Sequence, residues 1–189
     1  MIKLEDEIRS GKLQPLIANG NIQNRVRGLA QEINSFYQWE KGELILVGLA
    51  DGANIFLSDL IRFIPFKIKL YFVKVKTYCG TEKVGRDAVD TSEFSDDFCN
   101  SIDGNNVLVV DDVFDTGESL ESVCQAVEIF RPKTIKTVVL INKNKQRECG
   151  IKLDFVGFCV ADKFLVGYGM DFDGYYRNLQ DICGYLCIK

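Results

Sequence analysis

A chain of 189 residues with 47% hydrophobic residues is long enough to bury one good core and too short for two comfortable ones, so we expect a single domain. Its net charge of −4 argues against general affinity for nucleic acid or anionic membranes, because proteins that bind them usually carry a basic excess on one face. Any phosphate ligand must therefore meet a local site.

The residue types limit the chemistry further. The chain has no histidine, which excludes Ser-His and Cys-His dyads and leaves proton transfer to Asp, Glu, Lys, Tyr or Cys. Its seven cysteines are spaced singly, without a Cys-x-x-Cys pair, which is typical of free thiols in a reducing compartment. No stretch reaches the ~20 apolar residues of a membrane span, and the first residues mix acids and bases. We therefore expect a soluble cytoplasmic protein.

Apolar spacing predicts a helix, a strand and a second helix in the first third of the chain. Apolar residues from Ile22 to Tyr37 recur on one helical face, with Asn21 as the predicted cap. The run Leu44 to Leu49 is continuous enough for a strand buried on both faces. A tight turn, Ala50-Asp51-Gly52, then leads into a helix with apolar residues between Ile55 and Ile61.

The middle of the chain continues this alternation. The stretch Phe66 to Lys76 predicts a strand with a bulge, because its apolar alternation slips phase at Phe72-Val73. The polar segment from Thr77 to about Asn106 lacks a sustained period, and a loop of that length is usually functional or mobile. The elements predicted next are a strand from Asn106 to Val110, a helix from about Gly117 to Phe130 and a strand from Thr134 to Ile141.

Strands that alternate with helices imply an α/β fold, with a mainly parallel twisted sheet flanked by helices and right-handed crossovers. The tail differs, since short apolar runs divided by Gly and Asp suggest a strand-rich appendage. These runs are Phe155 to Val160, Phe164 to Val166 and Ile182 to Ile188. We expect one domain over residues 1–189, with a core of about 20–150 and a small strand-rich hood formed by 151–189 and the N-terminus.

The sequence VLVVDDVFDTGES, Val107 to Ser119, places carboxylates beside the start of a helix. In open α/β sheets, ligands bind at the carboxyl ends of strands, and a helix N-terminus offers free N–H groups and a positive dipole end. Asp111 and Asp112 stand at such a strand end, and Thr116 to Ser119 enter such a helix. The segment therefore offers carboxylates and an anion cradle close together.

Other interpretations of this segment compete. Acids at a strand end can be turn and cap chemistry, with Asp115 and Thr116 capping a helix. An apolar run that ends in Asp-Asp also opens phospho-receiver domains, but too few residues follow Asp111 for a complete receiver. A haloacid-dehalogenase-like phosphatase needs Asp-x-Asp, and Val113 occupies the second position. A Walker-type loop needs a Gly-Lys-Ser/Thr that is missing.

The complete string resembles the phosphoribosyl pyrophosphate (PRPP) signature of type I phosphoribosyltransferases: four apolar residues, two acids, two apolar residues, then Asp-Thr-Gly-x-Ser/Thr. DFVGFCVADKFLVGYGMDFDGYYRNL, Asp154 to Leu179, resembles the purine site of hypoxanthine-guanine phosphoribosyltransferases, and the likeness reaches back to Ile22-Gln23-x-Arg25-Val26. The resemblance implies the type I phosphoribosyltransferase fold. It also implies Mg²⁺-dependent transfer of the phosphoribosyl group of PRPP to N9 of hypoxanthine, guanine or xanthine, which gives the nucleoside monophosphate and pyrophosphate.

By this resemblance, Asp111 and Asp112 hold the ribose hydroxyls, directly or through Mg²⁺. The chemistry agrees, since vicinal hydroxyls and a hard cation both favour carboxylate oxygens. Asp115 faces N7 of the purine and takes or shares its proton as the bond to C1′ forms. The 5′-phosphate is cradled by backbone N–H groups and two hydroxyls of Thr116, Gly117, Glu118 and Ser119, with the Glu118 charge pointing outward.

The resemblance also assigns the purine site. Phe164 stacks on the base, Lys163 and Leu165 contact its exocyclic edge, and Lys143 donates to the 6-oxo group. A lysine donor there selects 6-oxopurines over adenine, whose amino group is itself a donor. Asp171 borders this site and assists a second Mg²⁺. Taken singly, Phe164 is better explained as a core side chain and Lys143 as a solvated lysine at a strand end, so the assignment depends on their occurrence together at the family's spacing.

The pyrophosphate loop departs from the family pattern. The family usually has Leu-Lys-Gly there, with a cis peptide at the first bond, whereas this chain has Ala50, Asp51 and Gly52. An aspartate near a tetra-anionic leaving group should weaken binding. Either Asp51 points away, so that backbone N–H groups and Mg²⁺ bind pyrophosphate, or the protein is a slow or specialised member. Arg177 is the further residue assigned to pyrophosphate.

Thr77 and Tyr78 stand where the family has Ser-Tyr, and the resemblance assigns them to a lid that excludes water. The expected partners are PRPP and a 6-oxopurine, with no nucleic acid and no membrane, in a homodimer or homotetramer. The alternative from another class is a PRPP-sensing regulator that keeps the fold and binds RNA or DNA. The acidic composition and the lack of a basic cluster argue against it.

Overall fold

A computed structural model describes residues 7–8, 11–75, 89, 91, 94–147 and 149–186. In chain order the elements are β1 (Leu13–Ile17), α2 (Asn19–Tyr37), β2 (Leu44–Ala50), α3 (Asn54–Ile61), β3 (Ile68–Lys74), α4 (Asp96–Ile102), β4 (Asn106–Phe114), α5 (Glu118–Glu128), β5 (Thr134–Asn144), β6 (Phe155–Ala161), β7 (Leu165–Val166) and β8 (Ile182–Tyr185). A five-stranded sheet has the order β3-β2-β4-β5-β6, and a three-stranded sheet has the order β1-β8-β7. The expected α/β fold with a small strand-rich hood is confirmed.

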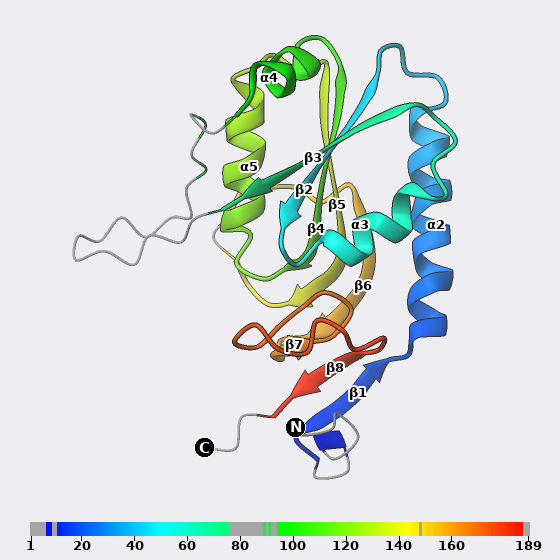
Figure 1. Cartoon of the computed structure of the whole chain (residues 1–189), viewed down its shortest axis with the longest axis vertical. Helices are drawn as coiled ribbons and strands as arrows, with labels where there is room; N and C mark the ends of the chain where they lie inside the picture. Colours follow the sequence, from blue (N-terminus) through cyan, green and yellow to red (C-terminus); the bar gives the residue numbers. More distant parts are fainter. Residues whose placement is uncertain are drawn as a thin grey trace, which may run out of the picture.

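Helices cover both faces of the parallel five-stranded sheet, with α2 and α3 on one side and α4 and α5 on the other (Figure 1). The central strands read as continuous apolar runs because alternate residues enter two separate cores. Leu44 and Leu46 pack with α2 and α3, whereas Ile45 and Val47 pack with α4 and α5. No helix of the described residues is both long and apolar enough to cross a bilayer.

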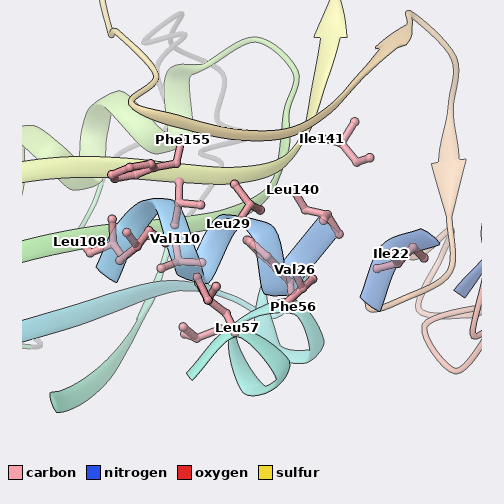
Figure 2. Close-up of a cluster of buried hydrophobic side chains, with 14 of the residues drawn as sticks. Ile22, Val26, Leu29, Phe56, Leu57, Leu108, Val110, Leu140, Ile141 and Phe155 are labelled. Carbon is pink, nitrogen blue, oxygen red and sulfur yellow. The ribbon is translucent and has the colours of Figure 1, made fainter. Parts of the chain in front are cut away.

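The first core joins α2 and α3 to the middle of the sheet. Figure 2 shows Val26 and Leu29 of α2 and Phe56 of α3 directed toward side chains of β4 and β5, among them Val110 and Leu140. All five of these side chains are fully buried or nearly so. Because this layer fixes the carboxyl ends of β2 and β4, it positions the loops that follow them.

Strand β3 differs from the prediction, since no bulge interrupts it between Ile68 and Lys74. It pairs with β2 in unbroken parallel register, with Ala50 opposite Lys74. The phase slip in the sequence arises because Phe72 and Val73 are both apolar on opposite faces. Val73 is buried in the second core, whereas Phe72 is 47% exposed at the edge of the sheet. Apolar residues on both faces therefore imitate the pattern of a bulge.

The first long helix also begins earlier than predicted. Helix α2 starts at Asn19 with Ala18 at the N-cap, so Asn21 lies inside the first turn instead of capping it. The carboxylate of Asp181, just before β8, accepts a hydrogen bond of 2.8 Å from the Asn19 N–H. This acceptor satisfies one of the unpaired donors of the helix start. Because the acceptor comes from the hood, the local sequence does not reveal it.

Strand β6 was predicted to belong to the hood, and this assignment is wrong. It lies parallel to β5, with Val138 opposite Phe155, and forms an edge of the main sheet. Arg25 of α2 donates to the carbonyls of Val156 at 2.6 Å and Gly157 at 2.9 Å. These bonds attach the first long helix to the edge strand. Among the described residues, the strands of the hood are β1, β7 and β8.

The polar segment before β4 contains a short helix that the sequence pattern did not predict. Helix α4 is capped by Ser95, whose hydroxyl accepts a hydrogen bond of 3.2 Å from the Phe98 N–H, and it buries Phe98 and Ile102. Two apolar anchors in seven residues are too few to give a period. Thr77 and Tyr78, the predicted lid residues, lie outside the described residues.

Phe56 provides a test of the first core. Its side chain is fully buried, so we expect Phe56→Ala to lower the free energy of unfolding by ~3–5 kcal/mol in urea denaturation. Trp39→Ala is the matched control, because Trp39 is 85% exposed and its loss should change stability by about 0.5 kcal/mol at most. Equal losses in the two variants would contradict this packing.

Candidate active site

A cleft of about 350 Å³ lies between the hood and the carboxyl ends of the central strands. Its lining consists of Asp51, Gly52, Asp112, Val113, Asp115, Lys143, Phe164, Leu165, Met170, Asp171 and Arg177. Residues from the loop after β2, from β4 and its exit, from the end of β5 and from the hood therefore meet in one place. Sequence reasoning had assigned nine of these residues and had missed Val113 and Met170, which carry no polar group that would single them out.

Several predicted residues lie beside the cleft instead of lining it. Within the described chain these are Ala50, Asp111, Thr116, Gly117, Glu118, Ser119 and Lys163. Asp111 is 8% exposed, whereas the Glu118 and Lys163 side chains are exposed. Gly117 has a φ of 88° and precedes α5, and the Glu118 N–H donates to the Thr116 hydroxyl at 3.3 Å. The first turn of α5 thus opens from the exit of β4, as an anion-binding helix start requires.

The two carboxylates of Asp111 and Asp112 lie at the end of the pairing between β2 and β4. One oxygen of Asp111 accepts the Asp112 N–H at 2.9 Å, and one oxygen of Asp112 accepts the Val113 N–H at 2.9 Å. Burial and the charge of Asp112 raise the pKa of Asp111 well above its usual range. Burial also raises the pKa of Asp112, against the opposing effects of hydrogen bonds and the charge of Arg177. This pair favours a cation or hydroxyl donors at its open side.

Close contacts at two glycines join the hood to the loop that follows β2, and join this loop to β4. A Cβ atom at Gly52 would collide with the Asp112 carboxylate, and a Cβ atom at Gly169 would collide with the carbonyl of Gly52. Gly169 also has a φ of 101°, which L side chains rarely adopt. Each of these positions requires glycine because backbone or carboxylate atoms occupy the space of a side chain.

The loop after β2 holds the residue that departs from the family pattern. The peptide bond between Ala50 and Asp51 is cis. The Asp51 side chain borders the cleft, is 54% exposed, and has one oxygen 3.9 Å from the Nζ atom of Lys74. Because both partners are exposed, this ion pair is weak and leaves the Asp51 charge close to the cleft.

Arg177 and Asp171 form an ion pair at the hood side of the cleft. The guanidinium of Arg177 lies 2.7 Å from Asp171 Oδ1 and donates to the Gly169 carbonyl at 2.5 Å. The other oxygen of Asp171 accepts the Gly174 N–H at 2.8 Å. Both side chains are therefore held in fixed directions, with the arginine charge near Asp112.

Asp115 is the most densely paired carboxylate of the cleft. Lys143, whose side chain is 8% exposed, lies 2.5 Å from Asp115 Oδ2, and Lys145 is ion-paired with Oδ1. Burial would raise the pKa of Asp115, but hydrogen bonds and charge from the two lysines outweigh it, so the pKa is lowered. Asp115 is therefore a carboxylate at neutral pH.

Sequence reasoning missed two cations near Asp115, Lys145 and Arg147. The guanidinium of Arg147 donates to the carbonyls of Asp115 at 2.5 Å and Phe114 at 2.8 Å, and also to that of Lys143. It lies 4.4 Å from the centre of the Phe114 ring. Lys143, Lys145 and Arg147 are spaced two residues apart at the end of β5, and this spacing was the available signal.

The acidic side chains fit a hard cation by the chemistry of their oxygens. No group of three or more His, Cys, Asp or Glu residues in the described chain is arranged to hold a metal by itself. Mg²⁺ commonly takes one or two protein carboxylates and completes its shell with substrate phosphate oxygens and water. Asp111, Asp112 and Asp171 are therefore suited to a cation that arrives with a phosphorylated ligand.

Known proteins resemble this chain in both sequence and fold. A family model described as the phosphoribosyl transferase domain matches residues 16–173. A hypoxanthine-guanine phosphoribosyltransferase of Aquifex aeolicus is 40% identical over 176 residues, which cover 93% of this chain and 96% of that protein. A hypoxanthine phosphoribosyltransferase structure from Staphylococcus aureus has a TM-score of 0.82 at 29% identity, with 95% of each chain covered. One from Trypanosoma cruzi, in complex with the product IMP, has a TM-score of 0.77 at 28% identity, with 91% of this chain and 89% of that one covered.

The buried carboxylate pair predicts an effect on stability. A carboxyl whose pKa is raised by folding destabilises the folded state as pH rises above its ordinary pKa. We expect Asp111→Asn to increase the free energy of unfolding of the ligand-free protein at pH 7 by roughly 1 kcal/mol, because the amide oxygen still accepts the Asp112 N–H. Urea denaturation measures this gain, which should shrink as pH falls toward 4.

The control for this variant is Asp103→Asn. Asp103 is 52% exposed and pairs at 3.0 Å with Arg131, so its charge contributes little to stability. A loss of stability at pH 7 in Asp111→Asn, with none in Asp103→Asn, would show that the Asp111 charge is compensated within the protein.

Proposed function

This chain belongs to the phosphoribosyltransferase family, among the hypoxanthine-guanine phosphoribosyltransferases, and we propose that its cleft transfers the phosphoribosyl group of PRPP to N9 of hypoxanthine or guanine. It is an enzyme of purine salvage. The observation that supports the substrate assignment is the meeting, in one cleft, of Asp112, the Asp115–Lys143 pair and Phe164. One end of this set suits a sugar with its cation, and the other suits a flat base with an oxo group.

The sugar phosphate is proposed to lie over the exit of β4. Asp111 and Asp112 accept hydrogen bonds from the ribose hydroxyls or hold Mg²⁺, and Asp171 assists a second ion. Mg²⁺, when bound, neutralises charge on the pyrophosphate leaving group. Backbone N–H groups and the hydroxyls from Thr116 to Ser119 bind the 5′-phosphate, since the start of α5 combines free donors with a positive dipole end.

The base is proposed to lie between the hood and β5. Phe164, which is 46% exposed, offers its ring as a stacking surface, with Leu165 and Lys163 beside the exocyclic edge. Lys143 donates to the 6-oxo oxygen. Asp115 accepts the N7 proton or shares it, and a carboxylate with a lowered pKa suits sharing better than complete removal.

In the reaction, the N9–C1′ bond forms as the bond from C1′ to the pyrophosphate oxygen breaks. Positive charge develops on the ribose, and the leaving group takes the electron pair with Arg177 and the backbone of Ala50, Asp51 and Gly52 nearby. Exclusion of water protects the ribosyl cation from hydrolysis. Thr77 and Tyr78, outside the described residues, are the proposed lid.

We also propose a third base, an oligomeric state and a cellular location for this protein. Xanthine is a third candidate base, because it shares with hypoxanthine and guanine the 6-oxo group that Lys143 is proposed to contact. A homodimer or homotetramer is the proposed assembly, supported by Leu70 and Phe72, which are 36% and 47% exposed on the edge strand β3. A cytoplasmic location is supported by five cysteines that are free among the described residues.

An activity assay tests the function directly. The protein is incubated with Mg²⁺, PRPP and one base at a time, and nucleotide and pyrophosphate are measured. We expect IMP from hypoxanthine and GMP from guanine, with adenine converted at least ~100-fold less efficiently because Lys143 faces its amino group. Lys143→Met should narrow that preference. Absence of nucleotide with every 6-oxopurine would contradict the proposed function.

Asp51 makes a separate prediction about PRPP. Replacing Asp51 removes a negative charge that borders the cleft, so we expect Asp51→Asn to lower the KM for PRPP by about 3-fold and Asp51→Lys by about 5-fold. The second gain is limited because the new lysine would lie near Lys74. Initial rates at varied PRPP measure both constants. Unchanged KM values would mean that Asp51 points away from the bound pyrophosphate.

A further inference from the structure

Two lysines and two acids alternate at the purine side of the cleft. Besides their contacts with Asp115, Lys143 lies 3.7 Å from one oxygen of Asp162 and Lys145 lies 3.9 Å from the other. Lys145 is 27% exposed at its side chain, whereas Lys143 is 8% exposed. The four charges sum to zero, so each acid remains opposed by a cation if one lysine changes partner.

The backbone fixes the place of Lys145. Its N–H donates to the Lys143 carbonyl at 3.0 Å, and Arg147 donates to its carbonyl at 3.5 Å. Arg147 also bonds the carbonyls of Phe114 and Asp115, which belong to the exit of β4. These hydrogen bonds hold the exits of β4 and β5 together. They also fix the turn from which the Lys145 side chain contacts Asp115.

In the proposed function, two interactions compete for the Lys143 ammonium group. It must donate to the 6-oxo group of the base, yet it is bound to the oxygen of Asp115 at 2.5 Å. Asp115 in turn needs an oxygen free for N7. If Lys143 were the sole cation on Asp115, its move to the base would leave that carboxylate unpaired in a partly buried place, at a cost in binding energy.

We propose that Lys145 is a positioning residue of the purine site: it holds Oδ1 of Asp115, so that Oδ2 and Lys143 are free to meet N7 and the 6-oxo group. This inference rests on the proposed function. Lys145 touches neither base nor sugar in this role and acts through Asp115. It would therefore affect use of the base and leave use of PRPP unchanged.

A change in the pH profile follows from the same contacts. The charged groups around Asp115 are Lys143 and Lys145 from the exit of β5, Asp162 after β6, and Arg147 at its backbone carbonyl. Loss of Lys145 removes one of two cations that lower the pKa of Asp115. Its pKa then rises, Asp115 takes a proton at higher pH, and the acid limb of kcat/KM for the base moves upward.

The experiment compares Lys145→Met with Lys145→Arg. For the methionine variant we expect the KM for hypoxanthine to rise about 10-fold, the KM for PRPP to stay within about 2-fold, and the acid limb to move up by roughly 0.5–1 pH unit. The arginine variant keeps the charge and should restore both properties. The matched control is Lys133→Met, which removes a lysine paired at 2.6 Å with Glu40 at the other end of β5 and should change neither.

The possible outcomes separate this inference from the proposed function. A wild-type protein that makes no nucleotide contradicts the function itself. An active wild type whose Lys145→Met variant keeps its hypoxanthine KM and its acid limb overturns the role of Lys145. Equal rises in the KM for hypoxanthine and for PRPP, or failure of arginine to rescue, also overturn it. If the methionine variant does not fold, as judged by circular dichroism, Lys145→Gln is measured against the same criteria.

Discussion

The carboxylates of Asp111 and Asp112 lie side by side where β4 leaves its partner β2. The repulsion between these two negative charges is the constraint around which the rest of the site is arranged. Burial and mutual charge raise the pKa of Asp111, while backbone N–H groups orient one oxygen of each acid. Gly52 packs on the Asp112 carboxylate, and Arg177 supplies the positive charge nearby. We propose that a ligand with hydroxyls and a cation offsets this repulsion, so the arrangement that lowers stability in the free protein favours binding.

Both ends of the described chain help to build the hood that borders the cleft. Strands β1 and β8 lie side by side in the hood (Figure 1), with Leu13 opposite Tyr185. The carboxylate of Asp181 caps α2, and the turn at Gly169 packs on the carbonyl of Gly52. Through these contacts the hood sets the distance between the ring of Phe164, which we propose stacks on the base, and the acids of β4.

Local sequence patterns predicted the elements of the fold that short stretches of the chain determine. The strand, turn and helix around Asp111 to Ser119 follow from an apolar run, an acidic end and a glycine before a helical pattern. The cap of α2 by Asp181 and the place of β6 in the main sheet depend on segments far apart in the chain, so no local pattern contains them. The contacts of Lys145 and Arg147 depend on how two strand exits meet, and the resemblance offered no residue role at those positions.

The central claim is that the Asp111–Asp112 pair is completed by a sugar phosphate together with Mg²⁺. Thermal unfolding of the wild type with PRPP tests it most directly, in Mg²⁺ and in EDTA. Saturating PRPP with Mg²⁺ should raise the midpoint by about 5 °C or more, since a ligand at 100 times its Kd adds ~2.7 kcal/mol to stability. In EDTA the rise should nearly vanish. An equal rise with and without Mg²⁺ would contradict the account.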